Sequence, residues 1–463
     1  MKLNLTPLEI HEQFVDGQLD KNSVFEALVS FIENDPEIEV RVQSIEFLGK
    51  IDFRDIKIYA FLKQLLTSGS DSRVRGAAAK IIVHNFLDKG IDAIQWALEH
   101  DISLNCATTI INALKEIDEN IIQPLLIDIF QNFIKTKTID GRYNLSDYFK
   151  ELFRSKPVEQ FLRDELILMF YNFKFIRFLV QKFNRKEVFS FLAPQDGFVS
   201  ILELINLDIT DMDEFEGLEH LTRLEKLVIS GTQIKEIKGL ENFTRLHTLE
   251  ITRNLITEIK GLDTLTNLST LNLSNNQITE IKGLENLKNL IILKLGNNNF
   301  HNKEWPQNKI TKIQGLDSLT NLWELHIPFN AITEISGIGN LIKLDRLFLN
   351  DNEITDIKGL ESNPGLGMVG LNNNRITEIS GLDSHQYLTY LYLSNNQVKE
   401  IKGVENLPRL SKLDLSYNNI TEIKGLENLS KSTGVDLTGN PIIDRDDLKE
   451  FPNVRFGDDS VKK

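Results

Sequence analysis

Leucine and isoleucine return at fixed positions through the second half of the chain. From residue 199 onward the frame reads LxxLxLxxNxIxxIxGL, and Leu268, Leu271, Leu273, Ile278 and Ile281 show one copy of it. The glycine near the end of the frame occurs ten times, and eight of the nine steps between these glycines are 22 residues long while one is 32. A fixed period of this length indicates a repeat architecture, in which each unit buries its apolar residues against its neighbours.

The alternation within the frame predicts a short strand in every repeat. The two leucines of LxL lie two residues apart, so on an extended strand they face the same way and fill the interior, while the residues around them face outward. Glycine before the closing leucine allows a left-handed backbone that other residues resist. We therefore expect about eleven stacked coils over residues 196–445, sharing one continuous core.

Asparagine follows each predicted strand. Its side chain can donate and accept hydrogen bonds at once, so a column of these residues can satisfy the backbone groups that are exposed where each coil turns. Thr210 and Thr232 hold the position in the first two copies, which predicts a weaker column there. The other members are Asn254, Asn276, Asn298, Asn330, Asn352, Asn374, Asn396, Asn418 and Asn440.

The frame resembles the leucine-rich repeat, and its closing phrase IxGLENL is most similar to the 22-residue class of the nuclear type-1 phosphatase regulatory subunit. Bacterial internalins share the period and are less similar at that phrase. The resemblance covers residues 199–445 and implies a curved α/β solenoid with a parallel sheet on its concave side. It implies no particular partner, because the shared letters are the buried ones.

Residues 1–195 have helical spacing instead, and a weaker recurrence links PEIEVRVQS (36–44), SDSRVRGAA (70–78) and HDISLNCAT (100–108). Each segment has an acidic residue, Glu37, Asp71 or Asp101, three positions before an aliphatic one, as in capped helices. Over residues 20–135 this pattern resembles HEAT repeats, which implies an α-solenoid. We expect residues 1–195 to form a HEAT-like domain that also caps the leucine-rich solenoid.

Aromatic residues are concentrated near the end of this first domain. We expect helices over residues 145–192 to carry eight phenylalanines from Phe161 to Phe191, which form core and a lid over the first coil or, alternatively, an aromatic docking groove. At the other end, residues 446–463 are expected to supply a cap and a short tail, with Leu448, Phe451, Val454 and Phe456 as its apolar residues.

Charge and cysteine content narrow the class of protein. The formal charge is −15, and residues 196–463 contain 28 Lys and Arg against 39 Asp and Glu. Such an acidic surface repels phosphate backbones, which argues against nucleic acid and favours a folded protein with a basic surface. The single cysteine, Cys106, excludes an intramolecular disulfide and points to a reducing compartment. With no signal-peptide-like or membrane-spanning run, we expect a cytoplasmic protein.

Catalytic motifs are missing from the sequence. It contains no GxxxxGK[ST], HExxH, GxSxG or CxxC, and its eight histidines are scattered, so we expect neither an enzyme nor a cofactor or metal. Cys106 is interpreted as a small buried residue. Asp414 and Asp436 occupy the same position in adjacent coils, and we interpret them as an acidic patch or a receptor for lysine or arginine.

The outward strand positions change character along the repeats. They are mostly small or polar in coils two to five and become aromatic and charged in coils six to ten. Aromatic residues and arginine are enriched at protein interfaces, although cross-strand packing is an alternative reason for rings on a sheet. A ten-residue excess in coil five, around residues 298–308, adds an aromatic loop. The predicted partner-binding residues are Phe329, Arg346, Phe348, Tyr390, Tyr392, Lys412, Asp414, Tyr417 and Trp305.

These observations favour a non-enzymatic scaffold or regulator that binds a folded protein on the concave face of coils six to ten. One alternative is a regulatory subunit of a protein phosphatase, which the closing phrase suggests. Another is an enzyme, since HEAT-like repeats occur in bilin lyases and some leucine-rich repeat proteins carry ligase domains. That alternative needs a nucleophile or an acid/base cluster, and none is evident in the sequence.

Overall fold

A computed structural model of the chain describes residues 5–51, 55–101, 103–135, 158–183, 189–192, 198–296, 306–443 and 453–455. The chain divides into two compact units. The helical unit comprises residues 1–186, 193–198 and 215–221, and the repeat unit comprises residues 187–192, 199–214 and 222–463. The prediction that residues 1–195 cap the solenoid stays a prediction.

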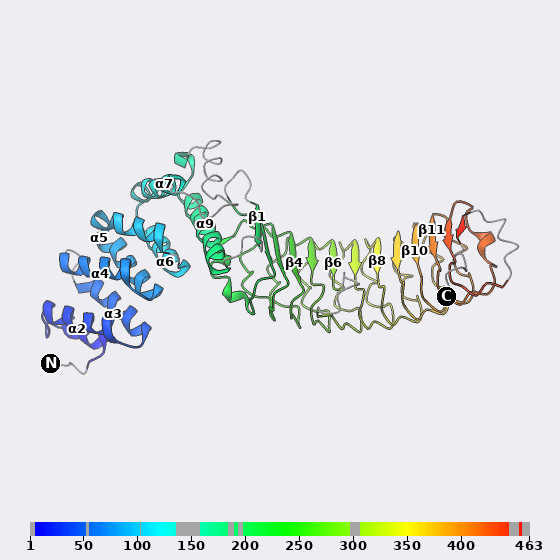
Figure 1. The fold of residues 1–463 in the computed structure, drawn as a ribbon, viewed down its shortest axis with the longest axis horizontal. Coiled ribbons are helices and arrows are strands. Elements are labelled where there is room, and N and C mark those ends of the chain that lie inside the picture. Colours follow the sequence, from blue (N-terminus) through cyan, green and yellow to red (C-terminus); the bar gives the residue numbers. More distant parts are fainter. Residues whose placement is uncertain are drawn as a thin grey trace, which may run out of the picture. The chain divides into compact units, whose positions relative to one another are not determined.

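The helical unit is built from successive packed helices (Figure 1). Its described helices contact their neighbours in sequence, as in α2 with α3, α4 with α5 and α5 with α6, which confirms the predicted helical repeat region. The described α-helices are α1 (Pro7–Val15), α2 (Lys21–Asn34), α3 (Ile38–Ile51), α4 (Ile56–Ser68), α5 (Ser72–His100), α6 (Leu104–Lys115), α7 (Glu119–Lys135) and α9 (Arg163–Phe183). Short 3-10 turns are η1 (Val158–Gln160) and η3 (Leu218–His220).

The helix starts match the predicted acidic caps in one of three segments. The Asp71 carboxylate accepts the backbone N–H groups of Arg73 and Val74 at the start of α5. At the first segment Asp35, rather than Glu37, accepts a backbone N–H. At the third, Asp101 lies at the end of α5, and Ser103 caps α6 instead. The prediction that Asp101 caps a helix start was wrong, because Asp101 ends α5 and its carboxylate binds the Arg75 guanidinium.

Asp101 is the centre of a buried polar cluster in the helical unit. Arg75 donates to both carboxylate oxygens, Nε to Oδ2 at 2.6 Å and Nη2 to Oδ1 at 2.9 Å, and the backbone N–H of Ser103 donates to Oδ1 at 2.9 Å. Lys174 from α9, only 2% exposed, donates to the Asp101 carbonyl oxygen at 2.9 Å. Cys106 lies beside this cluster, and burial raises the pKa of its thiol, which supports its interpretation as a structural residue.

The repeat unit contains one sheet whose strands follow each other in sequence order. All neighbouring strands are parallel except β1 and β2, which are antiparallel. Each residue pairs with its equivalent in the next coil, as Leu347 does with Val369. The strands are β1 (Phe189–Leu192), β2 (Ile201–Ile205), β3 (Lys226–Ser230), β4 (Thr248–Thr252), β5 (Thr270–Asn272), β6 (Ile292–Lys294), β7 (Glu324–His326), β8 (Arg346–Phe348), β9 (Met368–Gly370), β10 (Tyr390–Tyr392), β11 (Lys412–Asp414), β12 (Gly434–Asp436) and β13 (Val454–Arg455).

The eleven strands from β2 to β12 confirm the predicted number of coils and their concave parallel sheet (Figure 1). The helical assignment for residues 145–192 was wrong at its end, because Phe189 and Phe191 lie on β1. The alternation Phe-Ser-Phe-Leu is a strand pattern and explains this outcome. At the C-terminal end β13 pairs with β12, whereas Leu448, Phe451 and Phe456 lie outside the described residues.

The predicted core forms as expected. The middle residue of each short strand, such as Leu325, Leu347 or Leu391, is fully buried. Gly337, with φ of +67°, shows why the closing glycine is needed, since a Cβ there would overlap the carbonyl oxygen of Ile313 in the preceding coil. The close stacking of the coils and the left-handed backbone therefore both require glycine at this position.

The asparagine column is a buried hydrogen-bond ladder. The Asn374 amide donates to the carbonyl oxygens of Leu349, Leu371 and Asn372, and its Oδ1 accepts the backbone N–H of Ile354 at 3.0 Å. Asn352, Asn396 and Asn418 repeat this arrangement in neighbouring coils. Each side chain therefore joins its own turn to the coil before it.

Two members of the predicted column need correction. In coil five the ladder position belongs to Asn308, which donates to the carbonyl oxygens of Leu273 and Leu295, and Asn298 lies outside the described residues. The additional ten residues thus precede the ladder position instead of following it. In the first copies Thr232 is buried and bonds Asn254, but Thr210 is exposed and bonds Glu214 instead.

No helix in the described segments is both long enough and apolar enough to cross a bilayer. Those segments also bring together no group of three or more His, Cys, Asp and Glu side chains suited to a metal ion.

Candidate partner-binding face

Strands β7–β11 hold most of the predicted partner-binding residues on one face of the sheet. The strands place Arg346 and Phe348 on β8, Tyr390 and Tyr392 on β10, and Lys412 and Asp414 on β11, while Phe329 and Tyr417 follow β7 and β11. Register alternation points these side chains away from the buried leucines. Tyr417 is 61% exposed and Tyr390 is 36% exposed. Trp305 lies outside the described residues.

The rings on this face are held in defined positions. Phe348 stacks on His326 with ring centroids 4.3 Å apart, and its Cδ1 lies 2.9 Å from where a Cβ on Gly370 would be. Gly370 in the next strand therefore gives the Phe348 ring its space. Tyr390 and Tyr392 have nearly parallel rings, inclined by 4° with centroids 6.4 Å apart. Packing fixes these rings without burying them in the core.

Phe329 and Tyr417 occupy an unusual backbone position. Both have φ of +55°, in the left-handed region, at the turn that follows the strand. The equivalent residues Asn275, Asn373 and Asn395 have φ of 56° to 58°, and asparagine tolerates this conformation. Bulky rings do not favour it, so local backbone preference gives no reason for them here.

We expect Phe329→Asn and Tyr417→Asn each to raise the free energy of unfolding, by about 1 kcal/mol, because asparagine relieves the left-handed strain. Urea titration of the full chain measures the change. The reverse substitution Asn395→Phe, at the same turn in coil nine, is the matched control and is expected to be destabilising. Loss of stability on replacing Phe329 or Tyr417 would show instead that their rings pack as core.

Charged groups around Phe348 form a short network. Glu324 Oε1 lies 2.6 Å from His326 Nε2, and Glu324 Oε2 lies 3.7 Å from Arg346 Nη1. Burial lowers the pKa of His326, although Glu324 acts in the opposite direction. Glu324 therefore holds both the histidine under Phe348 and the arginine beside it.

Asp351 follows β8 at the same left-handed turn. Asn373 donates to its Oδ1 at 2.9 Å, and no described residue donates to its buried Oδ2. Burial raises the pKa of this carboxyl group.

Asp414 and Asp436 are neighbours in register, as their repeat positions predicted. Each carboxylate also accepts the backbone N–H two residues later, that of Ser416 or Thr438, at 3.0 Å. This local bond is typical of aspartate at a turn. The pair therefore shapes the strand ends as well as adding negative charge to the face.

Sequence reasoning missed three residues beside the start of the strands. The Arg346 guanidinium lies 4.4 Å from the Trp323 ring centroid, and the Arg409 guanidinium lies 5.0 Å from that of Tyr387. At the position of Tyr387 and Arg409, earlier coils have Asn289 and Asn321, whose amides donate to the preceding coil. Replacement of the asparagine before the first leucine of the frame by Tyr387 in coil nine and by Arg409 in coil ten is the signal in the sequence.

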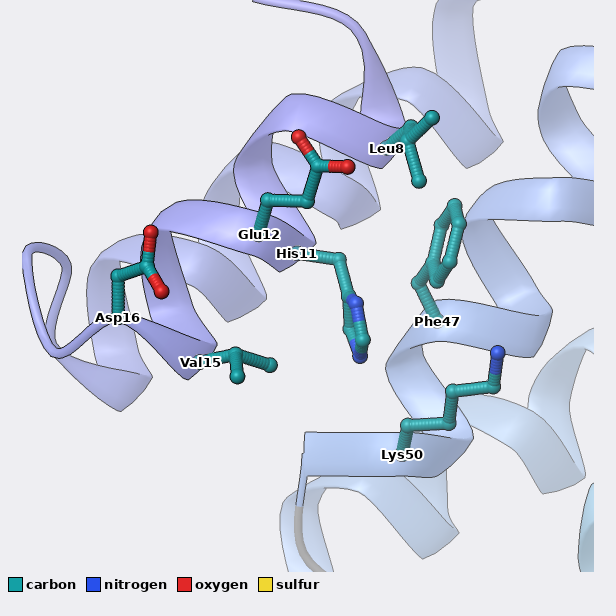
Figure 2. A pocket seen from close by; sticks show the side chains of 7 residues that line it. All are labelled: Leu8, His11, Glu12, Val15, Asp16, Phe47 and Lys50. Carbon is teal, nitrogen blue, oxygen red and sulfur yellow. The ribbon is translucent and has the colours of Figure 1, made fainter.

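The helical unit has a pocket of about 570 Å³ between α1 and α3, where His11 lies between the two helices (Figure 2). The His11 ring stacks on Phe47 at 4.7 Å, and burial with the nearby Lys50 lowers its pKa. Glu12 and Asp16 line the α1 side of the pocket. These groups show no nucleophile or acid/base pair, so we assign no site to this pocket.

Comparison with known proteins agrees with the repeat fold. Models of leucine-rich repeats in two copies match residues 222–264, 342–384 and 388–431, and a model of the single leucine-rich repeat matches residues 267–287. No curated protein is significantly similar to the chain.

Solved structures similar to the chain include two internalins from Listeria monocytogenes. InlF is 28% identical, with 56% of this chain and 86% of that chain covered and a TM-score of 0.44. InlJ is 27% identical, with 56% and 53% covered and a TM-score of 0.45, so the chain spans about half of that structure. A chain from the complex of latrophilin 3, Unc5D and FLRT2 is 23% identical, with 56% and 83% covered and a TM-score of 0.46.

The family matches lie within the repeat unit, and each spans coils that the structure shows stacked on a parallel sheet. The asparagine ladder and the buried leucine frame account for the positions that these repeats share. The chain is a leucine-rich repeat protein with an N-terminal helical region.

Proposed function

We propose that the chain is a non-enzymatic scaffold that binds a folded protein on the outward face of β7–β11. The observation that carries this proposal is the presence of Phe329 and Tyr417 at left-handed turns where asparagine is favoured. A fold selected for stability alone would place asparagine or glycine at these turns. Rings retained against local preference, on a rigid face, are suited to contact with another protein.

The surrounding residues support the same role. Phe348, Tyr390 and Tyr392 lie on the same face as these two turns, and their positions are fixed by stacking on neighbouring side chains or space left by glycine. Preorganised aromatic side chains lose little conformational entropy on association, which lowers the free-energy cost of binding.

The double variant Phe348→Ala/Tyr392→Ala tests the proposal. A crosslinking pull-down from native lysate, read by mass spectrometry, is expected to lose at least one partner protein by tenfold or more, since two truncated anchors remove a few kcal/mol of binding energy. The melting temperature is expected to change little because both rings lie outside the leucine core.

Thr248→Ala/Thr270→Ala is the matched control, because it truncates outward residues of β4 and β5 on the same sheet. Equal capture by wild type and both double variants would contradict the proposal and direct the search to the helical unit and Trp305. A large fall in melting temperature for Phe348→Ala/Tyr392→Ala would show that the rings serve packing.

The finer family assignments are also proposals. We propose that the helical unit is HEAT-like, on the basis of its successive packed helices and the capped start of α5. The buried thiol of Cys106 is consistent with action in a reducing, cytoplasmic compartment. A phosphatase regulatory role rests on the closing repeat phrase, and no contact in the described residues favours it. Recovery of a phosphatase catalytic subunit in the same pull-down would support that role.

A further inference from the structure

Three cations stack on aromatic rings beside the start of the strands in coils six to ten. Arg346 lies over Trp323, Arg409 lies over Tyr387, and Lys412 Nζ lies 5.3 Å from the ring centroid of Tyr392. We call Trp323, Arg346, Tyr387, Arg409 and Lys412 the leading edge. Cation–π contact holds each flexible side chain in a preferred position while leaving its hydrogen-bond donors available.

The two leading-edge cations of coil ten, Arg409 and Lys412, have no anionic partner among the described residues. Arg409 and Lys412 make no ion pair and no hydrogen bond through their side chains with any described residue, and both are exposed. Arg346 differs, because Glu324 and Asp345 lie 3.7 and 3.6 Å from its guanidinium nitrogens. Coil ten therefore presents two positive charges that are positioned by rings and that no described residue neutralises.

Negative charge lies toward the other end of the strands. Asp351 follows β8, and the Asp414 and Asp436 carboxylates turn toward the strand ends, where they accept the backbone N–H groups of Ser416 and Thr438. In coils ten and eleven the charge therefore separates across the strands, with Arg409 and Lys412 at the start and Asp414 and Asp436 at the end, although acidic residues exceed basic ones by 39 to 28 in residues 196–463. The net charge of the repeats is negative, but the local charge at Arg409 and Lys412 is positive.

We propose that the leading edge binds an acidic segment of the partner protein, with carboxylates opposite Arg409 and Lys412. This inference rests on the proposed function and specifies its partner. A guanidinium can bind a carboxylate through two parallel hydrogen bonds, and the ring behind it reduces the entropy lost on binding. An extended nucleic acid is disfavoured, because the nearby carboxylates and the net negative charge repel a continuous phosphate backbone.

Carbodiimide crosslinking tests this directly. The reagent condenses a carboxylate with a lysine amine to an amide, while the carbodiimide takes up the water as its urea, so it joins only groups already in contact. In nuclease-treated lysate, we expect peptides in which Lys412 is bonded to an Asp or Glu of the partner. Crosslinks only from Asp414 or Asp436 to partner lysines would overturn the inference, as would loss of the captured partner on nuclease treatment.

Charge reversal gives a second readout. Arg409→Glu/Lys412→Glu is expected to reduce capture at least tenfold, whereas Lys399→Glu/Lys402→Glu, which makes the same charge change on exposed residues of the preceding coil, is expected to leave capture unchanged. Equal effects of the two double variants would overturn the inference, since they would show a response to net charge alone.

The two proposals fail in different ways. Capture that depends on Phe348 and Tyr392 but survives Arg409→Glu/Lys412→Glu overturns the acidic-segment inference and leaves the proposed function standing. If the wild-type chain captures no partner protein, or if capture is indifferent to Phe348→Ala/Tyr392→Ala, the proposed function fails and this inference fails with it.

Discussion

Asn374→Ala is expected to lower the free energy of unfolding of the repeat unit by about 3 kcal/mol or more, because it leaves several buried backbone groups without partners. The wild-type amide serves three carbonyl oxygens, those of Leu349, Leu371 and Asn372, and accepts the N–H of Ile354. Water cannot reach these groups readily, since Asn374 is only 8% exposed. The loss therefore includes desolvation of backbone groups as well as the hydrogen bonds themselves.

Hydrogen–deuterium exchange of the full chain, read by peptide mass spectrometry, would localise this loss, and urea titration would measure its size. Faster exchange is expected in coils seven and eight, around residues 349–374. Asn406→Ala is the control, because among the described residues its exposed amide donates to Asp383 alone, and its removal is expected to cost less than about 0.5 kcal/mol. A similar small effect for Asn374→Ala would show that water replaces the ladder.

Asp101→Asn is expected to destabilise the helical unit by about 3–5 kcal/mol, the range for breaking a buried ion pair by removing one partner. The substitution leaves the Arg75 guanidinium partly buried without its carboxylate partner. Asparagine can accept only one of the two bonds from Arg75. Exchange in peptides of α5 and α6 is the measurement, and Asp88→Asn, on an exposed residue of α5, is the control.

The same cluster is expected to make the stability of the helical unit fall at acidic pH. Burial alone would raise the pKa of Asp101, but bonds from Arg75, Ser103 and Cys106 lower it overall below its ordinary value. A carboxyl group with a lowered folded-state pKa contributes stability that is present above about pH 4 and is lost as pH falls through the folded-state pKa. Asp101→Asn should remove this part of the pH dependence. Unchanged exchange in α5 and α6 at neutral pH would contradict the assigned role.

The repeat fold was predictable because one frame specifies the core, the turn and the ladder together. Leu325, Leu347 and Leu391 occupy equivalent strand positions, and each is buried where the frame places it. Because the frame recurs many times, a deviation in one copy does not obscure the pattern. The predicted number of coils and the predicted parallel sheet are therefore both confirmed. Residues 1–195 have only a weaker recurrence, and at their end Phe189 and Phe191 were assigned to a helix although they lie on β1.

The candidate face was predictable only in part. Outward positions such as Phe348 and Tyr392 follow from alternation, but the stacking of Arg409 on Tyr387 depends on side-chain directions at an irregular turn. Asn308 was missed because alignment from the strand assigned Asn298, whereas alignment from the following glycine assigns the correct residue. In a sequence with an insertion, the two ends of the repeat must therefore be aligned separately.

Because the strands pair in register, the sheet also fixes the distances between outward side chains on different coils. Since neighbouring strands lie about 4.8 Å apart, Phe348 and Tyr392, two strands apart, are separated by roughly 10 Å, and the turns bearing Phe329 and Tyr417, four coils apart, by roughly 19 Å. Any partner must match multiples of this spacing. Gain or loss of a whole 22-residue coil between two contact residues would change the distance between them by one strand spacing. The stacking of the remaining coils would be kept, because each coil packs only on its neighbours.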